Sequence, residues 1–153
     1  MNVPRIDRAE RLIAAPVQQV FSCWTDPNLL VQWLAPRGMT ARVDEFDPRV
    51  GKPFRLVLTY DDADQHGKSG DGEDVIAGQF VVVDPPHHLA FVSRFNSDDP
   101  AFQGEMRMDW TFEPLGAGTL VRIAARDVPP GISPEDHAAG MGSSMDQLAA
   151  LFE

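Results

Sequence analysis

The stretch SPEDHAAGMGSSMDQLAALF, residues 133–152, is the only long segment of the chain with helical periodicity. Ser133 is a typical helix cap, Pro134 suits the first helical position, and Glu135 and Asp136 place negative charge at the positive end of the helix dipole. Apolar residues then recur every three or four positions, which puts them on one face. They are Ala138, Met141, Met145, Leu148 and Phe152. The sequence therefore predicts a C-terminal helix over residues 133–152.

This helix needs a broad apolar partner. Twenty residues at about 1.5 Å each give a rod of roughly 30 Å, which cannot bury its apolar stripe alone. A sheet is the partner that the rest of the chain offers. Gly140 and Gly142 each cost about 1 kcal/mol relative to alanine inside a helix. Two glycines in one turn predict a kink or a close approach of another backbone.

Ahead of this helix, the N-terminal part of the chain predicts one strand and two short helices. Residues 6–13 lack glycine and lie between two prolines, which favours a strand. Val17–Trp24 has apolar residues on one helical face, and a second helix begins with the Asp26–Pro27 cap and runs to about Leu34. Pro36 and Gly38 end it, so we expect a helical hairpin.

From Met39 to Asp127 the apolar period changes to two, which is typical of strands with one buried face. The clearest example runs from Met106 to Glu113, where every even residue is large and apolar and every odd one is polar. Turn signals separate six such strands in succession, which implies an antiparallel meander. The predicted fold class is α+β: a curved antiparallel sheet of about seven strands around one long helix, in a single domain spanning residues 1–153. Such a sheet leaves a cavity beside the helix.

Composition excludes several classes of function. The 153 residues carry a formal net charge of −10, which repels nucleic-acid phosphates and anionic lipids. No window approaches the roughly 18 apolar residues of a membrane span. Cys23 has no second cysteine to pair with and lies in a helical pattern, so we expect a reduced, buried thiol in a cytoplasmic protein.

Local strings resemble a known family in the same order along the chain. The string APVQQVFSCWTDPNLLVQWLAP, residues 15–36, resembles the opening of SRPBCC domains related to the activator of the heat-shock protein 90 ATPase, a branch of the START and Bet v 1-like superfamily. HAAGMGSSMDQLAALF is similar to the family's final helix. Weaker likenesses lie between them, at Asp47, Gly51, Gly78 and Gly118. The resemblance implies the helix-grip fold.

Two positions depart from the family pattern. Lys52 stands where members often have a second glycine, and Met141 stands where many carry a tryptophan on the final helix. The second departure is expected to reshape the cavity. The eukaryotic co-chaperone of this family has an additional N-terminal domain that these 153 residues do not accommodate.

Aromatic and thioether side chains on the predicted inner faces are the candidates for a ligand cavity, because they fit varied apolar molecules. Ordinary packing in the core is the competing interpretation for each of them. The candidates are Trp33, Phe54, Leu56, Phe80, Phe91, Met106, Met108, Trp110, Met141 and Met145. The polar residues expected near the same cavity are Tyr60, Ser93 and His137.

Neither a metal nor a cofactor is predicted. Residues 62–73 match a calcium loop at Asp62, Asp64, Gly67 and Glu73, but strands rather than helices flank them, which favours a solvated hairpin loop. His87 and His88 follow two prolines at a turn and lack metal-ligand spacing. No phosphate-binding, dinucleotide-binding or nucleophile-elbow string appears.

Three functions remain as hypotheses. The first is the binding or transport of a small hydrophobic molecule, which requires no catalysis. The second, implied by the resemblance, is stimulation of a heat-shock protein ATPase, with a chaperone or a second copy of the chain as partner. The third is an enzyme similar to the polyketide cyclases of the superfamily. It needs His137 to point toward Tyr60 or Ser93, because proton transfer requires a partner group within hydrogen-bonding reach.

Overall fold

Seven antiparallel strands form one sheet in the computed structural model, which describes residues 4–62 and 72–153. Their order across the sheet is β1-β7-β6-β5-β4-β3-β2, so β1 and β2 are the two edges. The strands are β1 Ile6–Ile13, β2 Met39–Phe46, β3 Pro53–Tyr60, β4 Glu73–Asp84, β5 His88–Phe95, β6 Met106–Leu115 and β7 Gly118–Arg126. The predicted fold class is confirmed.

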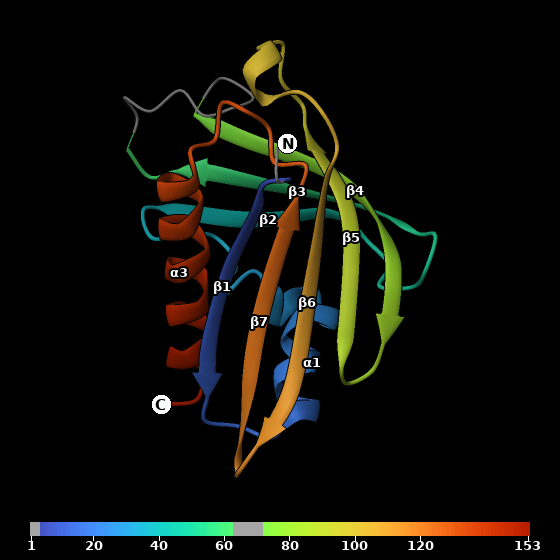
Figure 1. Ribbon diagram of the computed structural model, residues 1–153, viewed down its shortest axis with the longest axis vertical. Helices are drawn as coiled ribbons and strands as arrows, with labels where there is room; N and C mark the ends of the chain where they lie inside the picture. The colour runs from blue at the N-terminus through green and yellow to red at the C-terminus, as the bar shows by residue number, and fades with distance from the viewer. Residues whose placement is uncertain (1–3, 63–71) are drawn as a thin grey trace.

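The sheet is strongly twisted and curved. In Figure 1, β2 and β3 run across the direction of β1, β7 and β6, and β4 bends between the two groups. A register shift in β4 between Phe80 and Val82 marks a β-bulge, a feature that increases local twist and bends a strand. The curvature gives the sheet a concave inner face, on which the interior side chains of the protein gather.

Short helices connect β1 to β2 as expected, with one difference in length. Helix α1 is Val17–Thr25 and α2 is Pro27–Leu30, with the Asp26 side chain accepting the Asn28 N–H as a cap. The predicted second helix extended to about Leu34, which is wrong by one turn. After Leu30 the chain closes in turns, in which the Trp33 and Leu34 N–H groups both donate to the Leu30 carbonyl. The Trp33 side chain is held separately, by its indole N–H donating to the Cys23 carbonyl of α1.

Helix α3, Pro134–Ala150, begins with the predicted Ser133 cap, whose hydroxyl accepts the Asp136 N–H at 3.0 Å. Met141, Met145 and Leu148 are buried, but Ala138, expected on the same stripe, is exposed. The first turn of α3 is held instead by the hydrogen bond between His137 and the Asp7 carboxylate of β1. A Cβ added at Gly140 would meet nothing closer than 3.9 Å, and one at Gly142 would meet nothing within 4 Å, so the expected backbone approach is absent at both.

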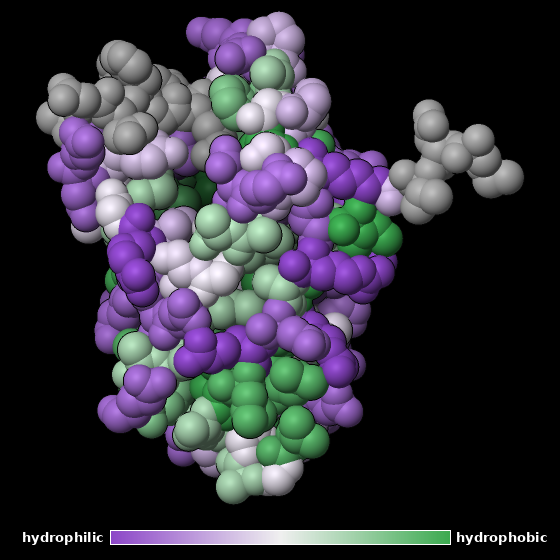
Figure 2. Space-filling view, turned by 60° about the vertical axis from the view of Figure 1, so that its left-hand side comes forward, coloured by the Kyte–Doolittle hydropathy of each residue, from purple (hydrophilic) through white to green (hydrophobic). Residues whose placement is uncertain are grey.

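Helix α3 runs alongside β1 at one edge of the sheet (Figure 1). Figure 2 shows this side of the molecule, where hydrophilic residues cover much of the surface and strongly apolar residues gather at the lower end. Leu12, Leu115 and Leu151 are among the large apolar residues that remain exposed. They come from the ends of β1 and β6 and from the residue after α3.

Candidate functional site

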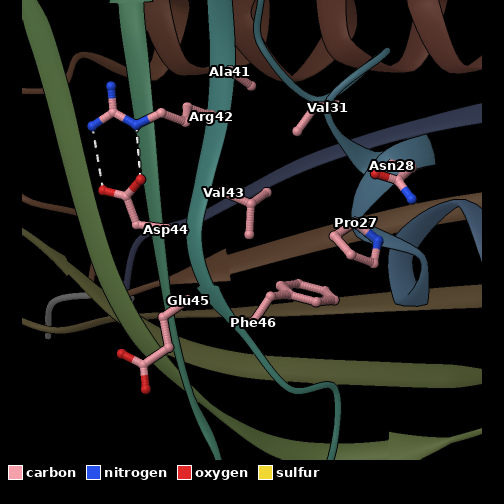
Figure 3. Close-up of a pocket in the computed structure, with 9 residues that line it drawn as sticks. All are labelled: Pro27, Asn28, Val31, Ala41, Arg42, Val43, Asp44, Glu45 and Phe46. Atoms are coloured by element: carbon pink, nitrogen blue, oxygen red, sulfur yellow. Dashed lines mark hydrogen bonds and ion pairs between the residues drawn. The ribbon is translucent and has the colours of Figure 1, made fainter.

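A hollow of about 480 Å³ lies between α2 and the edge strand β2. Figure 3 shows Val43 and Phe46 of β2 pointing toward Pro27 and Val31, whereas Arg42 and Asp44 point away. Its volume falls within the range of about 300–1,000 Å³ that is typical of small-molecule sites. The residues lining this α2–β2 hollow are Pro27, Asn28, Val31, Ala41, Arg42, Val43, Asp44, Glu45 and Phe46.

A β-bulge gives the hollow its apolar wall. Val43 and Phe46 are three residues apart, so in a regular strand their side chains would point to opposite faces. The register with β3 shifts between Val43 and Glu45, so that Val43 pairs with Leu56 and Phe46 with Phe54. Both partners are buried on the inner face. The extra residue therefore turns Phe46 inward beside Val43.

Behind the hollow, a continuous series of aromatic rings leads into the protein. Phe46 packs edge-on against Phe80 with ring centroids 5.6 Å apart. Phe80 contacts Phe54 at 5.1 Å, and both approach Phe91. Phe91 then lies 5.2 Å from Trp24. The edge-to-face contacts in this series have a geometry that aromatic pairs prefer.

Three tryptophans form the deepest part of this series. The ring centroid of Trp24 lies 5.3 Å from Trp110 and 5.9 Å from Trp33, and Trp33 lies 5.6 Å from Trp110. The Trp33 indole N–H donates to the Cys23 carbonyl at 3.1 Å. Within residues 4–62 and 72–153, the indole nitrogens of Trp24 and Trp110 have no hydrogen-bond partner, although these residues are only 1% and 2% exposed. Two buried donors are thus left without an acceptor.

The ten apolar candidates from the sequence divide between two clusters. Nine are buried and Met108 is half-buried. Met106 belongs to a separate small cluster with Ala125, and Met108 packs against both clusters. None of the ten lines the α2–β2 hollow itself. The main cluster holds Trp33, Phe54, Leu56, Phe80, Phe91, Trp110, Met141 and Met145.

The three polar candidates have separate surroundings. His137 Nδ1 lies 2.7 Å from the Asp7 carboxylate, and the Tyr60 hydroxyl lies 3.5 Å from that of Asp74. Ser93 is buried in β5. No hydrogen bond joins His137 to Tyr60 or Ser93 in the described part of the chain, so the pairing that the enzyme hypothesis required is not observed. The reason is that α3 packs on β1, which presents Asp7 to His137.

Asp7 is the centre of a charged cluster that the sequence analysis missed. Arg5 binds it through two nitrogens, at 2.9 and 2.8 Å, and also donates to the Ile132 carbonyl. The hydrogen bond from Arg5 lowers the pKa of the Asp7 carboxyl; burial opposes this effect, and the hydrogen bond with His137 adds to it. The two-residue alternation along β1 places Asp7 on the same inner face as Ile13. This alternation could have identified Asp7 from the sequence.

Asp74 is a second buried carboxylate that was missed. It is 2% exposed and pairs with Leu58 across β3 and β4. Its alternation with Ile76 and Gly78 indicates an inner-face position. The residues that partly match a calcium loop, for which the sequence favours a solvated hairpin loop, fall mainly on 63–71, outside the described residues. Among those described, no group of three potential ligands is placed to hold a metal ion.

The opposite face of the sheet carries a second hollow, of about 490 Å³, with a different character. Arg55 and Arg94 flank Ala77 on neighbouring strands, and the remaining lining residues are mostly small or polar. Arg55 already lies 3.8 Å from the Asp44 carboxylate. The α2–β2 hollow is the one whose lining includes a ring, Phe46, that packs against the aromatic interior, and we therefore take it as the candidate site.

Residues 14–153 match the family model described as Activator of Hsp90 ATPase homolog 1-like protein, and the chain belongs to this family. The resemblance noted in the sequence is confirmed. No match was found among curated proteins. In the described part of the chain, no helix is both long and apolar enough to cross a membrane.

Solved structures share the fold over nearly the whole chain. A protein of Chromobacterium violaceum is 29% identical with a TM-score of 0.85, covering 97% of this chain and 96% of its own. An AHSA1 protein from Silicibacter pomeroyi is 25% identical with a TM-score of 0.77, covering 96% of both chains. DynU16, a protein in the dynemicin biosynthetic locus, is 21% identical with a TM-score of 0.69, and the match covers 95% of this chain and 46% of DynU16. The last likeness concerns the fold alone.

Proposed function

We propose that the protein binds a small hydrophobic molecule that enters at the α2–β2 hollow and rests against the aromatic rings behind it. The observation that carries this proposal is the continuity between the hollow and the interior: Phe46 lines the hollow and is in ring contact with Phe80. Membership of an SRPBCC-type family, whose members commonly bind hydrophobic ligands, is consistent with it.

The two walls of the hollow differ in how firmly they are held. β2 is hydrogen-bonded to β3 along one side, whereas α2 is only four residues long. A helix of one turn has little hydrogen bonding of its own and depends on packing for its position. We propose that a ligand gains access to Phe80, Phe54 and Phe91 by separating α2 from β2.

The residues behind the hollow suit an apolar ligand of variable shape. Met141 and Met145 of α3 belong to the same buried cluster as the rings, and thioether side chains adapt their rotamers to irregular partners. We therefore propose that the ligand also contacts those sequence-predicted cavity residues that lie in the main cluster. Met106 is outside this set, because it packs in the separate cluster.

Titration of the purified protein with an apolar fluorescent dye tests the proposal. We expect saturable binding with one dye per chain. Val43→Trp fills the hollow and should weaken binding about tenfold or more, since the added ring occupies the entrance. Val50→Trp is the matched control, because Val50 is 62% exposed in the turn before β3 and lines neither hollow.

A second variant distinguishes ligand binding at the hollow from ligand binding in the interior. Met141→Trp adds volume at a buried position of α3 and should also weaken dye binding, with a modest loss of stability from overpacking. Loss of binding in Met141→Trp but not in Val43→Trp would place the ligand inside and the entrance elsewhere. Absence of saturable binding to the folded wild-type protein would refute the proposed function.

A further inference from the structure

The two buried indole N–H groups of Trp24 and Trp110 point to a chemical requirement on the ligand. Within the described residues neither has an acceptor, and each tryptophan is at least 98% buried. A buried donor without a partner costs about 1–3 kcal/mol, so such groups are uncommon in folded proteins unless something else satisfies them. The Trp24 and Trp110 rings have centroids 5.3 Å apart, so two hydrogen-bond donors without acceptors lie close together.

The position of these donors connects them with the α2–β2 hollow. Trp24 lies in the last turn of α1, and the chain continues from there through Asp26 into α2, whose Pro27 and Asn28 line the hollow. From the other wall, Phe46, Phe80 and Phe91 form a series of ring contacts that ends on Trp24. A molecule that enters among these rings approaches the tryptophans next.

We propose that the ligand of this site is a neutral, largely apolar molecule with an oxygen acceptor, such as an aromatic ketone, and that this oxygen accepts the indole N–H of Trp24, Trp110 or both. This inference rests on the proposed function and specifies its ligand. An indole N–H only donates, so the complementary group is an acceptor. No lysine, arginine or histidine is buried among the described residues, so a ligand carboxylate placed beside the tryptophans would carry a large desolvation cost. A neutral carbonyl or ether oxygen satisfies both conditions.

Fluorene and fluorenone form a suitable pair of probes, because they have nearly the same shape and differ by a CH₂ group against a C=O group. Calorimetric titration of the folded wild-type protein should show both probes binding. Fluorenone should bind about tenfold more tightly, since it provides the acceptor that the buried donors lack.

The three tryptophans supply an internal control. The chain has three indole N–H groups in all, so a ¹⁵N-labelled sample gives three indole signals. Fluorenone should move the signal of Trp24 or Trp110 downfield, as expected for a new hydrogen bond, and fluorene should not. The Trp33 signal should respond equally to both probes, because this N–H is already bonded to the Cys23 carbonyl.

Substitution by phenylalanine removes one N–H at a time. Trp24→Phe or Trp110→Phe should reduce the preference for fluorenone over fluorene, whereas Trp33→Phe should leave the preference unchanged. If a variant does not fold, as judged by circular dichroism, the indole signals of the wild-type protein decide the question alone.

The outcomes separate the two proposals. If neither probe binds while the apolar dye does, the inference fails and the proposed function stands; if the dye does not bind either, both fail. If both bind with equal affinity and no indole signal distinguishes them, the site binds apolar molecules but the inference is overturned. In that case the N–H groups are satisfied by ring faces or by water.

Discussion

The two edges of the sheet are covered in different ways. At the β1 edge, α3 lies along the strand and is tied to it by an ion pair between Arg11 and Asp146 and by a hydrogen bond between Asp7 and His137. At the β2 edge, the short helix α2 leaves the hollow of about 480 Å³. The β1 edge is thus covered by a long element with specific polar contacts, and the β2 edge is the one at which we propose that a ligand enters.

The same local motif occurs on both edge strands and shows this difference at the level of residues. Arg5 and Asp7 flank the start of β1, and Arg42 and Asp44 lie in β2; in each pair the arginine binds the carboxylate two residues later through two nitrogens. The Asp7 side chain is 6% exposed and that of Asp44 is 35% exposed. We therefore expect the arginine–aspartate pair to contribute to stability at Asp7, where α3 covers it, and to contribute little at the more exposed Asp44.

The largest effect is expected from Gly78→Ala, which tests whether ring packing holds the β2 half of the sheet. A Cβ at this position would lie 2.3 Å from the Phe54 ring and 2.6 Å from the Val92 carbonyl oxygen. The ring and the neighbouring strand would both have to move. We expect a loss of on the order of 3 kcal/mol in the free energy of unfolding, measured by urea denaturation. A loss below about 1 kcal/mol would show that Phe54 repacks freely.

A smaller effect is expected from Asp7→Asn, which keeps the shape of the side chain and removes its charge. Arg5 and His137 would then lose their buried carboxylate partner, and we expect a loss of about 2 kcal/mol, below the range for fully buried pairs because Arg5 is partly exposed. Asp44→Asn is the matched control. Exposed pairs contribute little, so its unfolding midpoint in urea should stay close to that of the wild type. Equal effects of the two variants would contradict the comparison of the edges.

The pH dependence of stability sharpens the same comparison. Because Arg5 and His137 hold the pKa of Asp7 below its ordinary value of 3.8, the folded state favours the ionised carboxylate. Its contribution is complete at pH values above 3.8 and is lost as the pH falls through the lower pKa of the folded protein. The stability difference between wild type and Asp7→Asn should therefore shrink as the pH falls below about 3.8. A difference that persists unchanged at pH 2 would exclude ionisation as its origin.

Much of the fold was predictable from local patterns. The alternation from Met106 to Phe112 and the cap at Ser133 are determined by neighbours in sequence, and both appear as expected in the structure. Ala138 was placed wrongly because helical periodicity defines a face but not how much of its length is covered. The coverage depends on where α3 meets β1, which is a long-range contact.

The site was predicted only in part, for a similar reason. The inner-face rings of β3, β4 and β5 follow from the two-residue period, and the structure gathers them in one cluster. The hollow depends on the bulge at Val43–Glu45, because an extra residue reverses the alternation that sequence analysis relies on. His137 was recognised as a polar candidate, but its partner Asp7 is 130 residues away and no local pattern connects them.

The smallest effect is expected from Gly142→Ala, on the helix that closes the β1 edge. Glycine inside a helix costs up to about 1 kcal/mol relative to alanine, because it loses more backbone freedom on folding. A Cβ at Gly142 would meet nothing within 4 Å, so the substitution should raise the free energy of unfolding by up to this amount without a steric penalty. Gly140→Ala should do the same, since its nearest contact would be Pro36 at 3.9 Å. Thermal unfolding of both variants measures the gain. A different result is possible, in which Gly142→Ala destabilises the protein while Gly140→Ala stabilises it. That result would mean that α3 packs more closely around Gly142 than the structure indicates, and it would contradict this description of the β1 edge.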